Sequence, residues 1–199
     1  MLRRCVDEVH HHQNAWMATR TLLALALTVP ASLAAQAPTI PGQQLSGPVI
    51  QSTGMSIKVD NLTFMAPAGH VFKAVFDINV GDSVKVNEQL NTLARFHNVH
   101  ARHDYPEARV KTAAVVHGSG WIALLTDSAF AARFGGKPNP SRRLVEELMQ
   151  HGAQLVLCGQ TAGARNVRRE ELLPGVKVAI SAMTAMNVLQ ADGYRFNPW

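Results

Sequence analysis

The chain has 199 residues, of which 47% are hydrophobic and 17% charged, a composition that fits one globular domain with some additional segments. The formal net charge is +5, but the basic residues are scattered along the chain and form no run of five or six. This distribution argues against a nucleic-acid-binding surface. The composition also gives no indication of a large disordered tail.

The first 37 residues are predicted to lie outside the fold. After Met17 come a basic start, an apolar stretch over residues 22–33 and a few small residues, which are the three parts of a secretory signal. The stretch is shorter than the roughly 20 residues of a membrane helix, so we expect cleavage near Ala35 to Ala37 and no membrane span afterwards. Residues 1–16 do not fit ahead of such a signal, so we expect translation to begin at Met17.

This prediction places the mature protein in the periplasm or outside the cell, and it leaves a single cysteine. Cys5 is removed with the leader, so Cys158 has no partner within the chain in an oxidising compartment. A leftover cysteine there favours an intermolecular disulfide or a reactive thiol, although a deeply buried thiol would also persist.

The mature chain is predicted to begin with an arm and to continue as alternating strands and helices. Residues 38–69 form the arm, and its alternating stretch over residues 55–62 predicts a short edge strand or hairpin. The domain proper covers residues 70–199. The predicted strands are residues 71–77, 110–116, 154–157, 176–180 and 193–196, and the predicted helices are residues 87–103, 121–134, 142–151, 161–172 and 182–191.

Strands and helices that alternate at these lengths predict a single doubly wound α/β domain with a mostly parallel five-stranded sheet. In such sheets, ligands bind outside the carboxyl ends of the strands. The residues at or just beyond each strand end are therefore the candidate site residues. They are Asp77, His117 with Gly118, Cys158 with Gly159 and Gln160, and Ser181 with Thr184.

Cys158 is the leading candidate because a short apolar run ends at this thiol and a helix is predicted to follow. Unpaired N–H groups at a helix N-terminus stabilise a thiolate, which is the reactive form of cysteine. His117 could stabilise or protonate a sulfur species, and the N–H groups of Gly159 and Gln160 could hold an anion. The alternative interpretation is that Cys158 is a small, buried, apolar side chain.

The other candidates also have structural interpretations. His117 can bond to the backbone at the end of its strand, and Asp77 can cap the loop that follows. Ser181 and Thr184 are well placed to cap a helix. The histidines of the predicted helix over residues 87–103 have no cysteine or carboxylate cluster beside them, so we expect no metal site, and no cofactor is expected.

Six short segments give the chain a resemblance to a known family. They are NEQL at 87–90, ARFHN at 94–98, VVHG at 115–118, LCGQ at 157–160, LPGV at 173–176 and SAMTA at 181–185. These segments resemble DsrE/DsrF-like proteins, and most closely the exported branch of that family. The resemblance extends over about residues 70–196.

The resemblance implies a flavodoxin-like subunit that assembles into trimers or hexamers. It also implies that a sulfane sulfur is carried as a persulfide on the cysteine that matches Cys158. The partner would be a small sulfur-containing anion or another sulfur-carrier protein, although the known relay partners of the family are cytoplasmic. The segment over residues 121–130, which is apolar on more than one helix face, is our candidate subunit interface.

Two functions remain open from the sequence. The first is a periplasmic sulfur-handling protein, a sulfurtransferase or a carrier, with Cys158 as nucleophile and His117 and the Gly159 and Gln160 amides steadying the persulfide. The second is a non-catalytic oligomeric module that binds a small anion at the strand ends and has a structural cysteine. A hydrolase using Ser181 or Cys158 lacks a convincing base and oxyanion arrangement.

Overall fold

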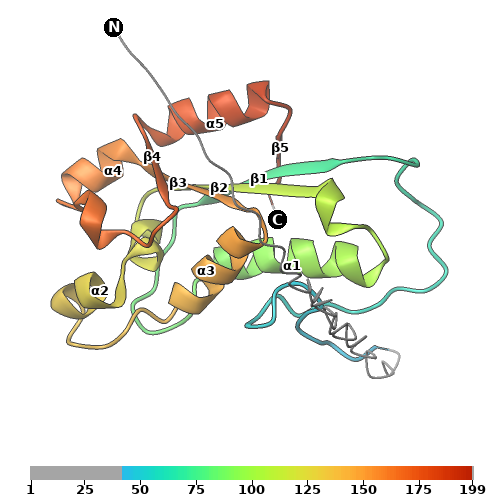
Figure 1. Cartoon of the computed structure of the whole chain (residues 1–199), viewed down its shortest axis with the longest axis horizontal. Helices are drawn as coiled ribbons and strands as arrows, with labels where there is room; N and C mark the ends of the chain where they lie inside the picture. The colour runs from blue at the N-terminus through green and yellow to red at the C-terminus, as the bar shows by residue number, and fades with distance from the viewer. Residues whose placement is uncertain (1–41, 199) are drawn as a thin grey trace, which may run out of the picture. The chain divides into compact units, whose positions relative to one another are not determined.

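A computed structural model describes residues 42–198 of the chain. The predicted leader lies outside the described residues, so its boundaries stay a prediction. The described part contains a five-stranded parallel sheet with strand order β4-β3-β2-β1-β5 (Figure 1). The strands are β1 (Phe72–Ile78), β2 (Val110–Val116), β3 (Gln154–Cys158), β4 (Lys177–Ala179) and β5 (Arg195–Phe196).

Helices cover both faces of this sheet. Figure 1 shows α1, α2 and α3 on one face and α5 on the other, while the short α4 follows the carboxyl end of β3. Crossovers between parallel strands are right-handed, so the face on which a connecting helix lies depends on the direction in which the next strand is added. The chain reverses this direction between β4 and β5, and α5 therefore lies on the other face. The helices are α1 (Glu88–Arg102), α2 (Asp127–Arg133), α3 (Arg142–Gln150), α4 (Gly159–Ala164) and α5 (Ala182–Ala191), and the 3₁₀ turns are η1 (Glu107–Arg109), η2 (Gly120–Leu124) and η3 (Arg169–Glu171).

The predicted α/β class and its single parallel sheet are confirmed. In the flavodoxin-like strand order 2-1-3-4-5, the outer neighbour of the first strand is the second strand. In this sheet the outer neighbour of β1 is β5, the last strand of the chain. As a result β1, β2 and β3 are consecutive neighbours in the sheet. Their carboxyl ends, which carry three of the predicted site residues, therefore lie next to one another.

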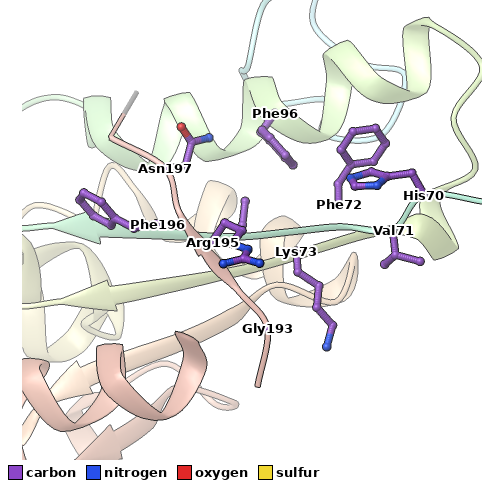
Figure 2. Close-up of a pocket in the computed structure, with 10 residues that line it drawn as sticks. His70, Val71, Phe72, Lys73, Phe96, Gly193, Arg195, Phe196 and Asn197 are labelled. Atoms are coloured by element: carbon purple, nitrogen blue, oxygen red, sulfur yellow. The ribbon is translucent and has the colours of Figure 1, made fainter. Parts of the chain in front are cut away.

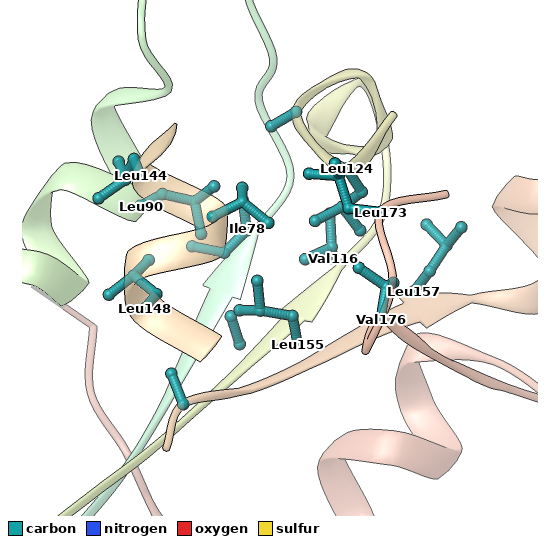
Figure 3. Close-up of a cluster of buried hydrophobic side chains, with 14 of the residues drawn as sticks. Ile78, Leu90, Val116, Leu124, Leu144, Leu148, Leu155, Leu157, Leu173 and Val176 are labelled. Carbon is teal, nitrogen blue, oxygen red and sulfur yellow. The ribbon is translucent and has the colours of Figure 1, made fainter. Parts of the chain in front are cut away.

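The larger hydrophobic core lies between the sheet and α1 to α3. Figure 3 shows Leu90 of α1 and Leu148 of α3 beside Ile78, Val116 and Leu155 of the strands. Each of these side chains is at most 1% exposed. Burial of one such aliphatic side chain contributes about 1.5 to 3 kcal/mol, so this face of the sheet holds most of the stabilising apolar contacts.

The other face of the sheet has a smaller core. There Val115 and Val156 of the strands pack against Leu189 of α5. Among residues 42–198, α5 is the long helix on this face, and apolar side chains remain exposed at its surface: Met183 is 80% and Val188 is 52% exposed. This half-covered face is where the candidate site lies.

The predicted helix over residues 121–134 is divided in two. Thr126 interrupts it, because its side chain accepts the N–H of Ala129 and so begins α2 after the 3₁₀ turn η2. The candidate subunit interface in this segment is wrong. Trp121, Leu124 and Phe130 are at most 7% exposed within the subunit and belong to its core, so they offer little surface to a partner.

The predicted helix over residues 161–172 is shorter and begins earlier. α4 starts at Gly159, directly after Cys158, and has six residues. Asn166 adopts a left-handed conformation with φ of 50°, which ends the helical path. The chain then forms the separate turn η3.

The predicted strand in the arm, over residues 55–62, is reduced to one antiparallel bridge between Leu45 and Ser56. The arm is instead held by the buried Asn98 of α1. Its Oδ1 accepts the N–H of Ile50 at 2.8 Å, and its Nδ2 contacts the carbonyl oxygens of Ile50, Thr53 and Gly54 at 2.9 to 3.1 Å. One side chain therefore fixes several backbone groups of the arm.

We expect Asn98→Ala to lower the free energy of unfolding by about 2 kcal/mol, because it removes several buried hydrogen bonds. The loss is limited because water can reach some of the arm backbone groups that these bonds satisfied. Urea unfolding followed by circular dichroism measures this change. Asn187→Ala, at an exposed position of α5, is the matched control and should change stability by less than about 0.5 kcal/mol. Equal stability of the two variants would contradict the anchoring role of Asn98.

Candidate functional site

Three of the predicted site residues lie on the same face of the sheet. Successive side chains of a strand alternate between its two faces. Ile78, Val116 and Leu157 face the larger core, so the neighbouring Asp77, His117 and Cys158 face α5. Val116, the last residue of β2, pairs with Leu157, so His117 directly after β2 follows the same register as Cys158 at the end of β3.

The sulfur of Cys158 lies at the beginning of two helices. Cys158 is the N-cap residue of α4. The N–H groups of Gln160 and Thr161 and the Thr161 hydroxyl lie near its sulfur and lower the pKa of the thiol. The N–H of Ala182, the first residue of α5, lies near the sulfur as well. N–H groups from two chain segments therefore converge on one sulfur atom.

These donors control the ionisation of the thiol. Burial by itself would raise the pKa of Cys158, because it disfavours the charged thiolate. The hydrogen bonds from Thr161, Ala182 and Gln160 outweigh this effect and hold the pKa of the Cys158 thiol below its usual value. The stabilisation comes from individual donors, since α4 is too short to have a substantial macrodipole.

Cys158 has features that fit each of the two interpretations made from the sequence. The residue is only 6% exposed, as expected for a structural cysteine, and it forms no disulfide within the described part of the chain. Its sulfur, however, faces N–H and hydroxyl donors rather than hydrocarbon alone. A thiol in such surroundings is suited to holding negative charge.

We expect Thr161→Val to raise the pKa of the Cys158 thiol, because valine cannot donate the hydrogen bond of the threonine hydroxyl. The rate of iodoacetamide alkylation near neutral pH should fall on the order of tenfold, as expected for loss of one hydrogen bond to a charged group. Peptide mass spectrometry reads this rate separately for Cys158 and Cys5. Thr184→Val is the control, because the Thr184 hydroxyl lies 3.0 Å from the Ser181 hydroxyl instead. Equal rates in both variants would contradict the role of Thr161.

His117 and Asp77 form a hydrogen-bonded pair on the same face of the sheet. The Nε2 atom of His117 lies 2.8 Å from Oδ1 of Asp77, and both side chains are about one third exposed. Asp77 therefore orients the imidazole ring and is not a cap of the following loop. The N–H of His117 also donates to the carbonyl of Ile78, which extends the pairing of β1 and β2 to the level of the site.

Two of the predicted glycines are places of close backbone approach. Gly118 has φ of 55°, and a Cβ atom there would overlap the carbonyl oxygen of Asn79. A Cβ atom at Gly159 would lie 2.5 Å from the carbonyl oxygen of Ala179. Both glycines thus allow the loops at the strand ends to pack tightly, and the fit at Gly159 brings the end of β4 close to Cys158.

The remaining candidates hold the beginning of α5 in place. The Ser181 hydroxyl accepts the N–H of Thr184 at 3.0 Å and is the N-cap of α5. Gln160 donates from Nε2 to the carbonyl oxygen of Ile180 at 3.2 Å. These contacts fix the segment that presents the N–H of Ala182 to the sulfur. Ser181, which caps α5, and Gln160 therefore both help to position this N–H group.

A comparison with protein-family models decides the relationship of this chain. The model of the DsrE/DsrF-like family matches residues 73–197, which include the five strands of the sheet, apart from Phe72 at the start of β1, and all the site residues described above. The chain belongs to the DsrE/DsrF-like family. The resemblance drawn from the sequence segments is thereby confirmed.

Other comparisons add little to the family assignment. Among solved structures, this DsrE/DsrF-like chain is similar to the protein of unknown function MTH1491 from Methanobacterium thermoautotrophicum. The two share 21% identity with a TM-score of 0.47, over 64% of this chain and 99% of that one. A search of curated protein sequences gives no significant match.

This DsrE/DsrF-like protein has a cavity of about 440 Å³ whose lining includes neighbours of Cys158 but not Cys158 itself. It is on the α5 face of the sheet and is lined by the Asp77 and His117 pair and by Ala182, whose N–H donates to the Cys158 sulfur. Its other walls are Val115, Met183, Met186, Gln190 and Phe196. The site thus combines an ionisable thiol, an oriented imidazole and an adjoining space.

A second cavity lies at the opposite end of β1. Its volume is about 460 Å³, and Figure 2 shows Phe72, Lys73 and Arg195 around it. Phe72 pairs with Val110, the first residue of β2, so this cavity is at the amino ends of the strands. It is therefore separate from Cys158, which lies at the carboxyl end of β3.

Residues 42–198 contain neither a metal-binding cluster of side chains nor a helix that could cross a membrane. No group of three or more His, Cys, Asp or Glu side chains in this part of the chain is arranged to hold a metal ion. None of its helices is both long enough and apolar enough to cross a membrane.

Sequence reasoning missed two donors of this site. Thr161 carries a visible signal, because it follows Cys158 at the start of a helix, where hydroxyl and N–H groups point toward the preceding residue. Ala182 carries no signal in its side chain. Its role depends on β4 pairing with β3, which brings the start of α5 back to the sulfur.

Proposed function

We propose that this protein handles sulfur by carrying a sulfane sulfur as a persulfide on Cys158. The family, which is associated with sulfur relay, supports the general role. The observation that carries the specific proposal is the set of N–H donors from Gln160, Thr161 and Ala182 around the Cys158 sulfur, with the lowered pKa that results. The thiolate is the form that attacks a sulfane sulfur, and a lowered pKa increases the fraction of Cys158 in that form.

The same donors suit the product of the reaction. After attack, negative charge resides on the outer sulfur of the persulfide, one bond length from the original thiolate. The N–H groups at the start of α4 and α5 stabilise an anion in this position. His117, held by Asp77, lies level with Cys158 and is the neighbouring side chain able to exchange a proton.

Location, partner and assembly belong to the same proposal. The predicted leader over residues 1–37 supports export to the periplasm, where the sulfur would pass to or from a small sulfur compound or a sulfur-carrier protein. Assembly into a homo-oligomer is supported by apolar exposure on the α5 face at Met183, which is 80% exposed.

The low exposure of Cys158 favours a second candidate function, a module that binds a small anion without using the thiol. In that case the N–H groups around the sulfur would serve only to stabilise the fold. The two candidates differ in one property, since only the first requires a covalent change at Cys158.

Persulfide trapping tests the proposal. Full-length protein incubated with inorganic polysulfide should gain about 32 Da per added sulfur on the peptide that contains Cys158. The Cys158→Ser variant should show no gain on that peptide, and a dithiol reductant should reverse the gain in the unmodified chain. Absence of the adduct on Cys158, with the chain folded and Cys5 resolved as a separate peptide, would reject the carrier function and leave the anion-binding module.

A further inference from the structure

The cavity beside Cys158 has a chemical character that the thiol alone does not explain. Its walls are mainly apolar, because Met183 and Met186 of α5, Phe196 of β5 and Val115 of β2 contribute to them. Thioethers and aromatic rings make favourable contacts with one another and with apolar or aromatic groups. The cavity is therefore suited to a hydrocarbon group.

The charges at the cavity do not favour a dianion. Among the described residues that line it, the ionisable ones are Asp77 and His117, which pair with each other, and no lysine or arginine is present. The Asp77 carboxylate would repel a compound such as thiosulfate, whose two negative charges would need cationic partners. An inorganic dianion would also leave most of a 440 Å³ space without a protein contact.

The cavity is connected to the thiol through two of its walls. Ala182 lines the cavity, and its N–H acts on the Cys158 sulfur. His117 lines the cavity and directly follows Val116, which pairs with Leu157 next to Cys158. Two residues of the lining are thus neighbours of Cys158, and the small exposure of this residue admits only a narrow group such as a terminal sulfur atom.

From these observations, and building on the proposed function, we infer that the cavity binds the apolar organic group R of a small persulfide, R–S–SH. The terminal sulfur is then presented to Cys158. The substrate class is an apolar organic persulfide rather than an inorganic oxyanion of sulfur.

The transfer balances without an oxidant or a reductant. The Cys158 thiolate attacks the terminal sulfur of R–S–SH, a new S–S bond forms on Cys158, and the S–S bond of the donor breaks with its electron pair going to R–S⁻. The proton of the donor's terminal S–H passes to R–S⁻, with His117 at the cavity wall as the side chain placed to relay it. The products are Cys158–S–S⁻ and R–SH.

The experiment compares loading of full-length protein from three probes: benzyl persulfide, thiosulfate and inorganic polysulfide. Peptide mass spectrometry follows the rate of sulfur addition at Cys158. We expect benzyl persulfide to load Cys158 at least tenfold faster than thiosulfate. Met183→Glu, at a position that is already 80% exposed, should slow loading from benzyl persulfide about tenfold and leave loading from polysulfide within about twofold.

Two further variants complete the test. Met186→Glu places the same charge deeper in the cavity wall and should slow benzyl persulfide loading at least as much. Val188→Glu, on the same helix but outside the cavity lining, is the matched control and should load like the unmodified chain. Light scattering reports whether any variant changes its assembly.

The outcomes separate the two proposals. The substrate class is overturned if Cys158 loads from polysulfide but loads no faster from benzyl persulfide than from thiosulfate. It is also overturned if Met183→Glu and Val188→Glu change the loading rate equally. Either result leaves persulfide carriage on Cys158 standing. A smaller assembly for Met183→Glu with unchanged loading also overturns the substrate class, because the apolar walls would then belong to a subunit interface. Failure of all three probes to load Cys158 overturns the proposed function itself.

Discussion

Gly159→Ala is expected to lower the free energy of unfolding by about 3 kcal/mol, because the added methyl group overlaps the backbone of the neighbouring chain segment. Its Cβ atom would lie 2.5 Å from the carbonyl oxygen of Ala179 and 3.1 Å from that of Ile180. Both oxygens are backbone atoms, so the end of β4 must move away from β3. Urea unfolding measures the loss of stability.

The same substitution should also slow alkylation of Cys158, on the order of tenfold near neutral pH, through loss of one hydrogen bond to the thiolate. The N–H of Ala182 follows the displaced segment by only two residues and should withdraw from the sulfur. Iodoacetamide labelling followed by peptide mass spectrometry measures this rate.

Gly163→Ala is the matched control for both measurements. Gly163 lies in the same helix, and a Cβ atom there would have no neighbour within 4 Å. Because alanine favours helix more than glycine does, this variant should gain up to about 1 kcal/mol and should keep the reactivity of Cys158. If Gly159→Ala behaved like Gly163→Ala, the close fit between β3, β4 and the start of α5 would be contradicted.

A second large effect is expected from His97, which should make the protein less stable as the pH falls below neutral. His97 is 1% exposed, its Nε2 lies 2.8 Å from the Thr112 hydroxyl, and its Nδ1 has no partner among the described residues. Burial lowers its pKa to about 4, against an opposing effect from the negative charge of Glu107. The folded protein therefore holds this ring neutral.

The sign of the effect follows from proton binding in the two states. An unfolded histidine has a pKa of about 6.5, so between that value and about pH 4 the unfolded chain binds a proton that the folded chain does not. The contribution of His97 to the free energy of unfolding is fully present above about pH 6.5. It is lost as the pH falls toward 4, and the total loss is about 3 kcal/mol. His100, whose pKa burial also lowers, acts in the same direction.

Urea unfolding at several values between about pH 5 and 7.5 measures this loss, in a range where histidines titrate more than carboxylates do. His97→Gln keeps a group that can bond to Thr112 and should flatten the pH dependence. His70→Gln, at an exposed position, should leave it as it is in the unmodified chain. Parallel pH curves for the two variants would show that His97 is not the source.

Much of the fold could be predicted because it depends on local patterns. Apolar runs that end at Asp77, Val116 and Cys158 predicted three parallel strands, which the structure has as neighbours. The rule that ligands bind at the carboxyl ends of such strands then gave the candidate site residues. The position of Cys158 before a helix was also readable, since Gly159 and Thr161 are common at helix starts.

What could not be predicted depends on strand order and on contacts distant in the sequence. The pairing of Asp77 with His117 requires β1 beside β2, and the contact of Ala182 with the sulfur requires β4 beside β3. The apolar residues near Trp121 were misjudged because a straight helix was assumed. The 3₁₀ turn η2 directs them into the core instead.

The most direct test of the thiolate site is the pH dependence of Cys158 alkylation by iodoacetamide in the folded, full-length protein, with the urea-unfolded chain as reference. The structure predicts half-maximal reactivity at a lower pH in the folded protein than in the unfolded chain, whose thiol titrates near its ordinary value of about 8.5. A midpoint equal to or above that of the unfolded chain, or no labelling of Cys158 until the protein unfolds, would contradict it.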